Sequence, residues 1–409
     1  MFLRPVRKAE YGQALPVSID DMLAEIRGQS ATIGAVIDKV QPQLEALDPA
    51  VLAGAAHIYI TGCGDSFFAG LAARLAFDQF AGVPTEPVEA LEFGRYVAEF
   101  MPPKSLVFGI SNSGKATRAV EALANARRRG AATVAITGNT SGWLAQEADI
   151  ILNQSAQVNG RALTMPSNLG SAAPLRGSFG LANYLASLTT LYLTAVHIGE
   201  VRGHLKPGQA DQLRLEIRGL AQTLDETVDQ CAPAAQSYTE QAKDIYHFAI
   251  LGGGPSYATS LFYAAKTFEL ARVNGVAQEL EEWAHEQFFL TGAGTQVIFI
   301  APPGRSTSRV VELLHTAKTM GATTVVVTDA AGDEVRALSD VLLPVAGKVR
   351  EVFSPMVYCV PGELLATYLA KARGRQAFQF DSETQYVMNM RTIQESQIVE
   401  FSGEAEPAN

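Results

Sequence analysis

Apolar and polar positions along this chain follow a repeating order that predicts strands, each followed by a helix. A short apolar run is followed by glycines, then by apolar residues at helical spacing, and then by a run rich in β-branched residues. This order is typical of βαβ units on a parallel sheet. We expect strands in two sets: 57–61, 105–110, 132–137 and 149–152, and then 247–251, 295–300, 323–328 and 340–344.

The segments between these strands predict helices that begin near residues 65, 115 and 141. Before the first strand, Ser18 to Leu47 predicts one further helix, capped by Asp20 or Asp21. Its apolar residues recur at helical spacing: Met22, Ile26, Ile33, Val36 and Ile37. Residues 155–180 are rich in Gly, Ser, Asn and Pro and predict a long loop, which in a compact α/β domain is usually functional or mobile.

The second set of strands repeats the first at a spacing of about 190 residues. HIYITGCGDSFFAGLAARLAFDQF, residues 57–80, aligns without a gap on HFAILGGGPSYATSLFYAAKTFEL, residues 247–270. The register persists from 105–123 onto 295–313. The fold class is therefore expected to be α/β, with two homologous doubly wound parallel-sheet lobes. We expect four parts: an N-terminal helical segment (1–50), a first lobe (51–205), a second lobe (206–380) and a tail (381–409).

Composition narrows the class of protein. With 409 residues, of which 47% are hydrophobic, the chain is too long for one ordinary core and too apolar for disorder. The net charge of -10 argues against nucleic acid as a partner. We find no secretory signal and no apolar run long enough to span a membrane, so the chain is expected to be cytoplasmic and not bound to a membrane.

The cysteines and histidines do not predict a metal site. The three cysteines are far apart in sequence, which fits a reducing compartment and excludes a CxxC knuckle. None of the six histidines pairs at ligand spacing. Neither a metal nor an organic cofactor is expected. A dinucleotide is disfavoured because Phe67 and Tyr257 stand where the third glycine of GxGxxG belongs.

Small polar residues follow two strands of the first lobe, where the chain turns into a helix. Ser66 lies just past Gly62-Cys63-Gly64-Asp65, and Ser111-Asn112-Ser113-Gly114 occupies the next such junction. Hydroxyl and amide groups, together with the N–H groups of helix N-termini, are suited to bind a phosphate. The second lobe has Ala301-Pro302-Pro303 at the equivalent place, so an anion pocket is expected in the first lobe only. The alternative is that these residues only form turns and caps.

In this order the motifs carry a family resemblance. MLAEIRGQ, TGCGDSFFAG, SNSG, AAKTFELA and EVFSPMVYCVPGELLATYLAKARG together resemble tandem sugar isomerase (SIS) domain proteins. The similarity is to the isomerase half of glucosamine-6-phosphate synthases and to glucosamine-6-phosphate deaminases, and it runs from about Met22 to Glu400. No glutaminase domain with its nucleophilic cysteine precedes the first lobe, so the resemblance implies no ammonia from glutamine.

The resemblance implies which residues of the first lobe bind the sugar's anionic group. They are Cys63, Gly64, Asp65, Ser66, Ser111, Asn112 and Ser113, to which we add Lys115 and Thr117. The family has an acidic residue and then a threonine after the SxSG step, whereas this chain has Lys115-Ala116-Thr117. The added cation leaves open whether the anion is a phosphate or another tetrahedral group such as a sulfonate.

Acid and base groups are expected in the second lobe. Lys266 and Glu269, at i and i+3, share a helix face, while Ala76 and Gln79 replace them in the repeat. The resemblance makes Glu269 the enolisation base and Lys266 its cationic neighbour. Taken without it, the two residues would be interpreted as an exposed ion pair.

The resemblance also implies that His285 opens the sugar ring in the active site of a neighbouring subunit. Glu281 or Glu282 is placed to orient it if the segment is helical, and Glu286-Gln287 replaces the family's Gly-Pro. In the tail, Glu395 stands where synthases have an imine-forming lysine, so imine chemistry is not expected here. Glu395 is either a second acid, an acceptor for sugar hydroxyls, or an ordinary surface residue.

These observations lead to three hypotheses. The first is an aldose–ketose isomerase of a phosphorylated or sulfonated hexose, a homodimer with a shared active site that works through an enediol. The second is an amino sugar phosphate deaminase, which needs the same proton transfer. The third is a non-catalytic sugar-phosphate binding protein, disfavoured because the first 50 residues contain no basic recognition helix.

Overall fold

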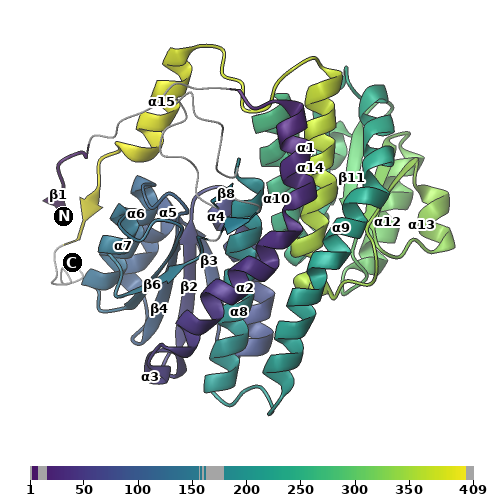
Figure 1. Ribbon diagram of the computed structural model, residues 1–409. Coiled ribbons are helices and arrows are strands. Elements are labelled where there is room, and N and C mark those ends of the chain that lie inside the picture. The colour runs from purple at the N-terminus through teal and green to yellow at the C-terminus, as the bar shows by residue number, and fades with distance from the viewer. Residues whose placement is uncertain (1, 8–15, 156, 159–160, 163–178, 402–409) are drawn as a thin grey trace. The chain divides into compact units, whose positions relative to one another are not determined.

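The computed structural model describes residues 2–7, 16–155, 157–158, 161–162 and 179–401 (Figure 1). The chain forms two compact units. Unit 1 is built from residues 1–15, 31–216 and 380–409, and unit 2 from residues 16–30 and 217–379. The C-terminal tail thus belongs to the same unit as the first sheet. Most of the loop predicted over 155–180 lies outside the described residues.

Unit 1 contains a five-stranded parallel sheet in the order β3-β2-β4-β5-β6. Its strands are β2 (His57–Gly62), β3 (Thr85–Glu89), β4 (Ser105–Ile110), β5 (Ala132–Thr137) and β6 (Ile150–Asn153). Two small antiparallel pairs add to it: β1 (Phe2–Leu3) with β14 (Val399–Glu400), and β7 (Gln157–Val158) with β8 (Arg161–Ala162).

Unit 2 contains a second five-stranded parallel sheet in the equivalent order β10-β9-β11-β12-β13. Its strands are β9 (His247–Gly252), β10 (Asn274–Glu279), β11 (Gln296–Ile300), β12 (Thr323–Thr328) and β13 (Val341–Pro344). The predicted fold class and strands are confirmed. The sequence prediction missed β3 and β10, which are edge strands whose sequences, TEPVE and NGVAQE, lack a clear apolar run.

Helices flank both sheets. Unit 1 has α2 (Ser30–Glu45), α3 (Pro49–Ala53), α4 (Asp65–Ala76), α5 (Ala90–Glu92), α6 (Thr117–Arg128), α7 (Trp143–Gln146), α8 (Leu181–Val201) and α15 (Glu383–Gln394). Unit 2 has α1 (Ile19–Gly28), α10 (Pro255–Lys266), α11 (Leu280–His285), α12 (Thr307–Thr319), α13 (Asp333–Leu338) and α14 (Pro355–Ala372). The division between the units falls within α9 (Gln209–Gln241).

Short 3₁₀ and π-helical turns complete the units. The π-helical turns are η1 (Phe77–Ala81), η2 (Phe93–Val97) and η4 (Thr267–Ala271). The 3₁₀ turns are η3 (Ala98–Phe100), η5 (Gln287–Leu290) and η6 (Glu351–Phe353). η1 and η4 end α4 and α10 at equivalent places, so the repeat extends to this irregular geometry.

The repeat is also visible in the backbone at the start of α4 and α10. Gly64 has φ 53° and ψ −127°, and Gly254 has φ 56° and ψ −129°. These angles belong to a region of conformational space that is open essentially to glycine alone. Each lobe therefore uses a glycine to turn sharply from its first strand into its first helix.

The single helix predicted over Ser18 to Leu47 is wrong in one respect. The segment forms two helices, α1 and α2, with a break at Gln29. The cap of α1 is Ser18, whose side chain accepts a hydrogen bond from the Asp21 N–H at 3.1 Å, while Asp20 and Asp21 lie in the first turn. Gln29 is buried and donates a hydrogen bond to the buried Glu363 carboxylate of α14, an interaction that the helical pattern alone did not predict.

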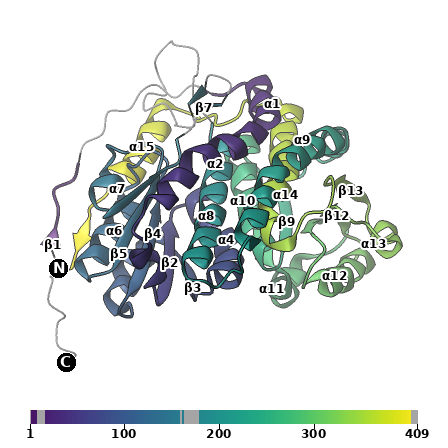
Figure 2. The same cartoon turned by 60° about the horizontal axis from the view of Figure 1, so that its bottom comes forward.

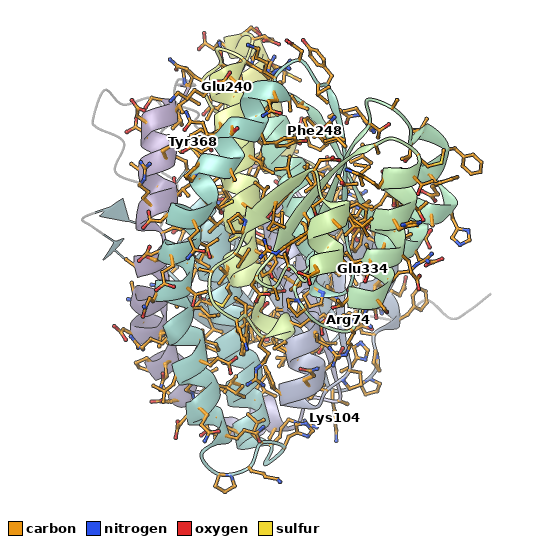
Figure 3. All side chains as sticks on the ribbon, turned by 90° about the vertical axis from the view of Figure 1, so that its right-hand side faces the viewer. Arg74, Lys104, Glu240, Phe248, Glu334 and Tyr368 are labelled. Carbon is orange, nitrogen blue, oxygen red and sulfur yellow. The ribbon has the colours of Figure 1, made fainter. Side chains whose placement is uncertain are left out.

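Each sheet packs its apolar side chains against its own helices. Phe248 of β9 is buried in unit 2, while Glu334 of α13 lies at its surface (Figure 3). α8 in unit 1 is buried along nearly its whole length, so the apolar stripe of Leu181 to Val196 forms core. Trp283 is fully buried, and Trp143 is partly buried against the core. In the described part of the chain, no helix combines the length and apolar character that a bilayer crossing requires.

His197 of α8 is expected to make unit 1 sensitive to acid. Burial lowers its pKa, and the positive charge of Arg214 lowers it further. Below its usual pKa of about 6.5 the unfolded chain takes up a proton at this residue while the folded chain does not, so stability is lost as pH falls. His197→Gln should reduce the drop in melting temperature between pH 7.5 and 5.5, two values chosen to bracket that pKa at roughly one unit on either side. An unchanged pH dependence would contradict this assignment.

Candidate functional site

The predicted anion-binding residues lie where the strand order of unit 1 reverses. The chain leaves β2 for β3 on one side and returns to β4 on the other. A Cβ on Gly70 of α4 would lie 2.7 Å from Ile60, and one on Gly109 would lie 2.5 Å from Leu123 of α6. Ile60 pairs with Phe108, so their side chains lie on the same face of the sheet, and Gly109, the next residue, lies on the other face. α4 therefore covers one face and α6 the opposite face, as Figure 2 also shows. Such a switch point is where open α/β sheets bind ligands.

The first loop, Cys63 to Ser66, turns tightly from β2 into α4. A Cβ on Gly62 would lie 2.7 Å from the Ser66 Cβ, and the Ser66 N–H donates to the Cys63 carbonyl at 3.2 Å. Cys63 and Gly64 are exposed, and Asp65 and Ser66 are partly exposed. The N-terminus of α4 therefore reaches solvent with its small polar residues around it.

The surroundings of the Cys63 thiol disfavour its ionised form. Although Cys63 reaches solvent, the protein packed around its thiol raises the pKa of that group, while the positive charge of Arg118 acts in the opposite direction. A raised pKa keeps the group a neutral thiol at neutral pH. Cys63 is thus suited to line the loop and not to form a covalent intermediate.

The second loop, Ser111 to Thr117, is braced by the neighbouring strands. The Ser111 N–H donates to Ile136 at 3.1 Å, and the Gly114 N–H closes a turn onto the Ser111 carbonyl at 3.0 Å. The Ser113 hydroxyl accepts from the Lys115 N–H at 3.3 Å. The Asn112 side chain accepts from Gln154 at 3.3 Å. These bonds tie the loop to β5 and to Gln154, which follows β6.

Thr117 begins α6 directly after this loop. Its side chain is buried, and its hydroxyl has no hydrogen-bond partner among the described residues. Because β2 and β4 are neighbours in register up to Thr61 and Gly109, both loops emerge at adjacent strand tips. The structure therefore brings together the nine residues expected to bind the anion.

The equivalent loop of unit 2 leaves its strand in the same way but differs in backbone and in chemistry: Gly114 is left-handed with φ 67°, whereas the Gly304 N–H donates to the Thr307 hydroxyl at 2.9 Å. The Ala301 N–H donates to Val327 at 2.9 Å, as Ser111 does to Ile136. Ala301, Pro302 and Pro303 carry no hydroxyl or amide side chain, and the two prolines have no N–H. Within one chain, only the loop of unit 1 therefore carries the hydroxyl and amide groups suited to an anion.

Lys266 and Glu269 form a close pair in unit 2. The Lys266 Nζ lies 2.7 Å from the Glu269 carboxylate, and 4.9 Å from the centre of the Phe262 ring. The Lys266 side chain is only 2% exposed, whereas that of Glu269 is 40% exposed. The pair is thus not an ordinary exposed ion pair: a buried cation fixes one oxygen of a carboxylate that reaches solvent. Glu269 lies in the π-helical turn η4, and such turns are frequent at functional sites.

His285 lies at the opposite edge of the same sheet from Glu269. η4 precedes the start of β10, whereas α11 follows its end. A six-residue strand separates these edges by about 20 Å. The His285 side chain is 71% exposed and lies 3.6 Å from Glu281, which also binds Arg309 at 2.8 Å. Glu269 and His285 of one copy of the chain are therefore not brought together in unit 2.

Glu395 of the tail belongs to unit 1. It caps the C-terminal end of α15, and its carboxylate lies 3.8 Å from the Arg391 guanidinium. Its side chain is only 17% exposed, so it is not an ordinary surface glutamate.

Three charged residues beside the second loop were not predicted from the sequence: Arg95, Arg118 and Glu121. Burial lowers the pKa of Arg118, while Glu121 at i+3 raises it. Arg118 and Glu121 had the same i,i+3 spacing as Lys266 and Glu269, so the sequence carried a signal for them. Their contacts with the tail were not predictable from that spacing.

The two-lobed fold and the switch-point loops define the class of protein. The SIS domain family model matches residues 51–168 and 241–369, so the chain belongs to the SIS domain family. The glutamine–fructose-6-phosphate aminotransferase (isomerizing) of Synechocystis sp. is 26% identical over 341 residues, which are 81% of this chain and 51% of that protein. The chain thus spans about half the length of this relative.

Solved structures share the fold. The C-terminal domain of glucosamine-fructose-6-phosphate aminotransferase from Francisella tularensis matches with a TM-score of 0.74 at 20% identity, covering 88% of this chain and 98% of that one. Glucosamine-6-phosphate deaminase from Thermotoga maritima matches with a TM-score of 0.59 at 18% identity, covering 84% of this chain and 95% of that one. At these identities the similarity concerns the fold alone.

Proposed function

We propose that this protein is an aldose–ketose isomerase of a phosphorylated or sulfonated hexose. The observation that carries the proposal is the division of chemistry between the lobes. Unit 1 has a hydroxyl-lined switch-point loop, and unit 2 has a solvent-reaching carboxylate held by a buried lysine. The name of the Synechocystis aminotransferase, which includes fructose 6-phosphate, supports a hexose phosphate as the substrate class.

In the proposed mechanism the anion of the sugar binds at Ser66, Ser111, Asn112, Ser113 and Thr117. The N-termini of α4 and α6 and the Lys115 cation add favourable charge. These groups bind the anion but do not react with the sugar. The binding energy gained at the anion positions the rest of the sugar for the reaction.

Glu269 then removes a proton from one of the first two carbons of the open sugar and returns it to the other. The electrons of the broken C–H bond form the double bond between the two carbons, and the electrons of the carbonyl move onto its oxygen. That oxygen takes up a proton to give the enediol, and the neighbouring hydroxyl loses its proton when carbon is reprotonated, so that the carbonyl and hydroxyl exchange places. Lys266 orients the carboxylate through its hydrogen bond.

Ring opening is assigned to the His285 of a second copy of the chain. Its separation from Glu269 by the length of β10 and its high exposure support this assignment. The proposed enzyme is accordingly a homodimer with a shared active site. Glu395 accepts hydrogen bonds from sugar hydroxyls or acts as a second acid.

A panel of hexose phosphates, amino sugar phosphates and sulfonated hexoses in deuterated water tests the proposal. We expect deuterium at C1 or C2 of one sugar, without release of ammonia, by NMR and an ammonia assay. Release of ammonia would show that the protein is a deaminase and not an isomerase. Tight binding of a sugar without incorporation of deuterium would show that the protein is a non-catalytic sugar-binding protein.

A further inference from the structure

The end of the C-terminal tail runs alongside α6 in the same direction as the helix. The Gln397 carbonyl accepts from Arg118 in the first turn, the Val399 N–H donates to Glu121 at 2.7 Å, and the Phe401 N–H donates to Asn125 at 3.2 Å. The residues contacted on α6 thus advance in step with the tail. Both ribbon views show the yellow tail strand beside this helix (Figures 1 and 2).

Glu121 is the centre of these contacts. Its side chain is 0% exposed, and it accepts from the Arg95 Nε and the Arg118 Nη1, each at 2.7 Å, as well as from the Val399 N–H. Both arginines also donate to the Gln397 carbonyl. A buried carboxylate is stable only when such donors surround it, and an apolar side chain would often be at least as stabilising. The Glu121 carboxylate therefore contributes more to the position of the tail than to the stability of the core.

The direction of the tail determines where Glu395 lies. Gln397 is at the N-terminal turn of α6, so the residues before it lie beyond that end of the helix. The anion loop Ser111 to Thr117 leads into the same end of α6. α15, which Glu395 caps, also contacts α6. The tail contacts thus bring Glu395 to the edge of the sheet at which the anion loop lies.

We propose that Glu121 is a positioning residue: it fixes residues 397–399 on α6, and so holds Glu395 beside the bound sugar. We call Glu121, Arg95, Arg118, Asn125 and the tail residues 397–401 the tail anchor. The contacts described above support the tail anchor by themselves, whereas its effect on a bound sugar rests on the proposed function.

Glu121→Gln tests the anchor without any substrate. The amide keeps the size of the side chain but loses the charge that holds two guanidiniums, so amide hydrogens of residues 395–401 should exchange about tenfold faster or more by mass spectrometry. Arg127→Gln is the matched control, because Arg127 lies on the same helix and pairs with Asp149 at 2.9 Å instead of the tail. It should leave this exchange unchanged. Exchange in the Glu121 variant equal to that of the unmodified protein would overturn the anchor.

Val399→Pro provides a second variant, in case the loss of the buried charge unfolds the chain. It removes the N–H that donates to Glu121 and restricts the backbone of residues 398 and 399, but leaves that carboxylate paired with Arg95 and Arg118. The same acceleration of exchange over 395–401 is expected, with the rest of the chain as protected as before. Unaltered protection of the tail would again overturn the anchor.

Kinetics on the sugar found by the panel separate positioning from a merely structural role. Glu121→Gln should lower kcat by about tenfold to a hundredfold with KM nearly unchanged, because the anion loop is intact. It should add nothing to Glu395→Gln in the double variant, since both changes remove the same group from the sugar. Additive losses would overturn the positioning role. If no sugar is turned over, the proposed function fails, and hydrogen exchange still decides the anchor.

Discussion

Glu269→Gln is expected to lower the rate of deuterium incorporation into the substrate by about 10²-fold to 10⁴-fold, the usual contribution of a general base. An amide has the same shape as the carboxylate but cannot accept a proton from carbon. Its oxygen can still accept the hydrogen bond from the buried Lys266, so the local structure should persist. Affinity for the sugar should change little, because the anion loop lies in unit 1.

NMR of the sugar in deuterated water, together with calorimetric binding, measures both quantities. Glu312→Gln is a matched control, because Glu312 pairs with Arg309 at 2.8 Å at the same i,i+3 spacing and in the same unit. It should leave the exchange rate unaltered. If Glu269→Gln retained exchange within tenfold of the unmodified protein, a factor too small for the loss of a general base, Glu269 would not be the base.

Gly64→Ala is expected to weaken binding of the sugar's anion by about tenfold or more. Gly64 has φ 53° and ψ −127°, where an alanine is strained by about 1–3 kcal/mol. Relief of this strain moves the N-terminus of α4, whose N–H groups are proposed to bind the anion. A displacement that costs about 1.4 kcal/mol of binding free energy lowers affinity tenfold.

Gly254→Ala is the control that the duplicated fold provides. Gly254 has φ 56° and ψ −129°, and a Cβ on either glycine would meet no atom within 4 Å. The two variants should therefore lose similar thermal stability, by calorimetry. Only Gly64→Ala should weaken binding of inorganic phosphate and of the sugar, measured by titration calorimetry. Equal losses of affinity in both variants would remove the anion site from unit 1.

The pattern of the sequence determined most of the fold because its signals are local. Eight of the ten strands of the two sheets were predicted, and the two missed, β3 and β10, are edge strands without a clear apolar run. The repeat predicted equivalent turns, and Gly64 and Gly254 have nearly equal angles. The helical break at Gln29 was missed because its partner Glu363 is 334 residues away.

For the candidate site, the sequence by itself determined which residues follow strand ends and which share a helix face. Only the tertiary structure showed that Lys266 is buried beneath Glu269, that Thr117 carries a buried hydroxyl, and that Glu121 binds the tail at Val399. The spacing of residues along a helix or strand determines on which face each side chain lies, but only over a few residues. Burial and long-range partners depend on how distant segments pack, and no local pattern contains that information.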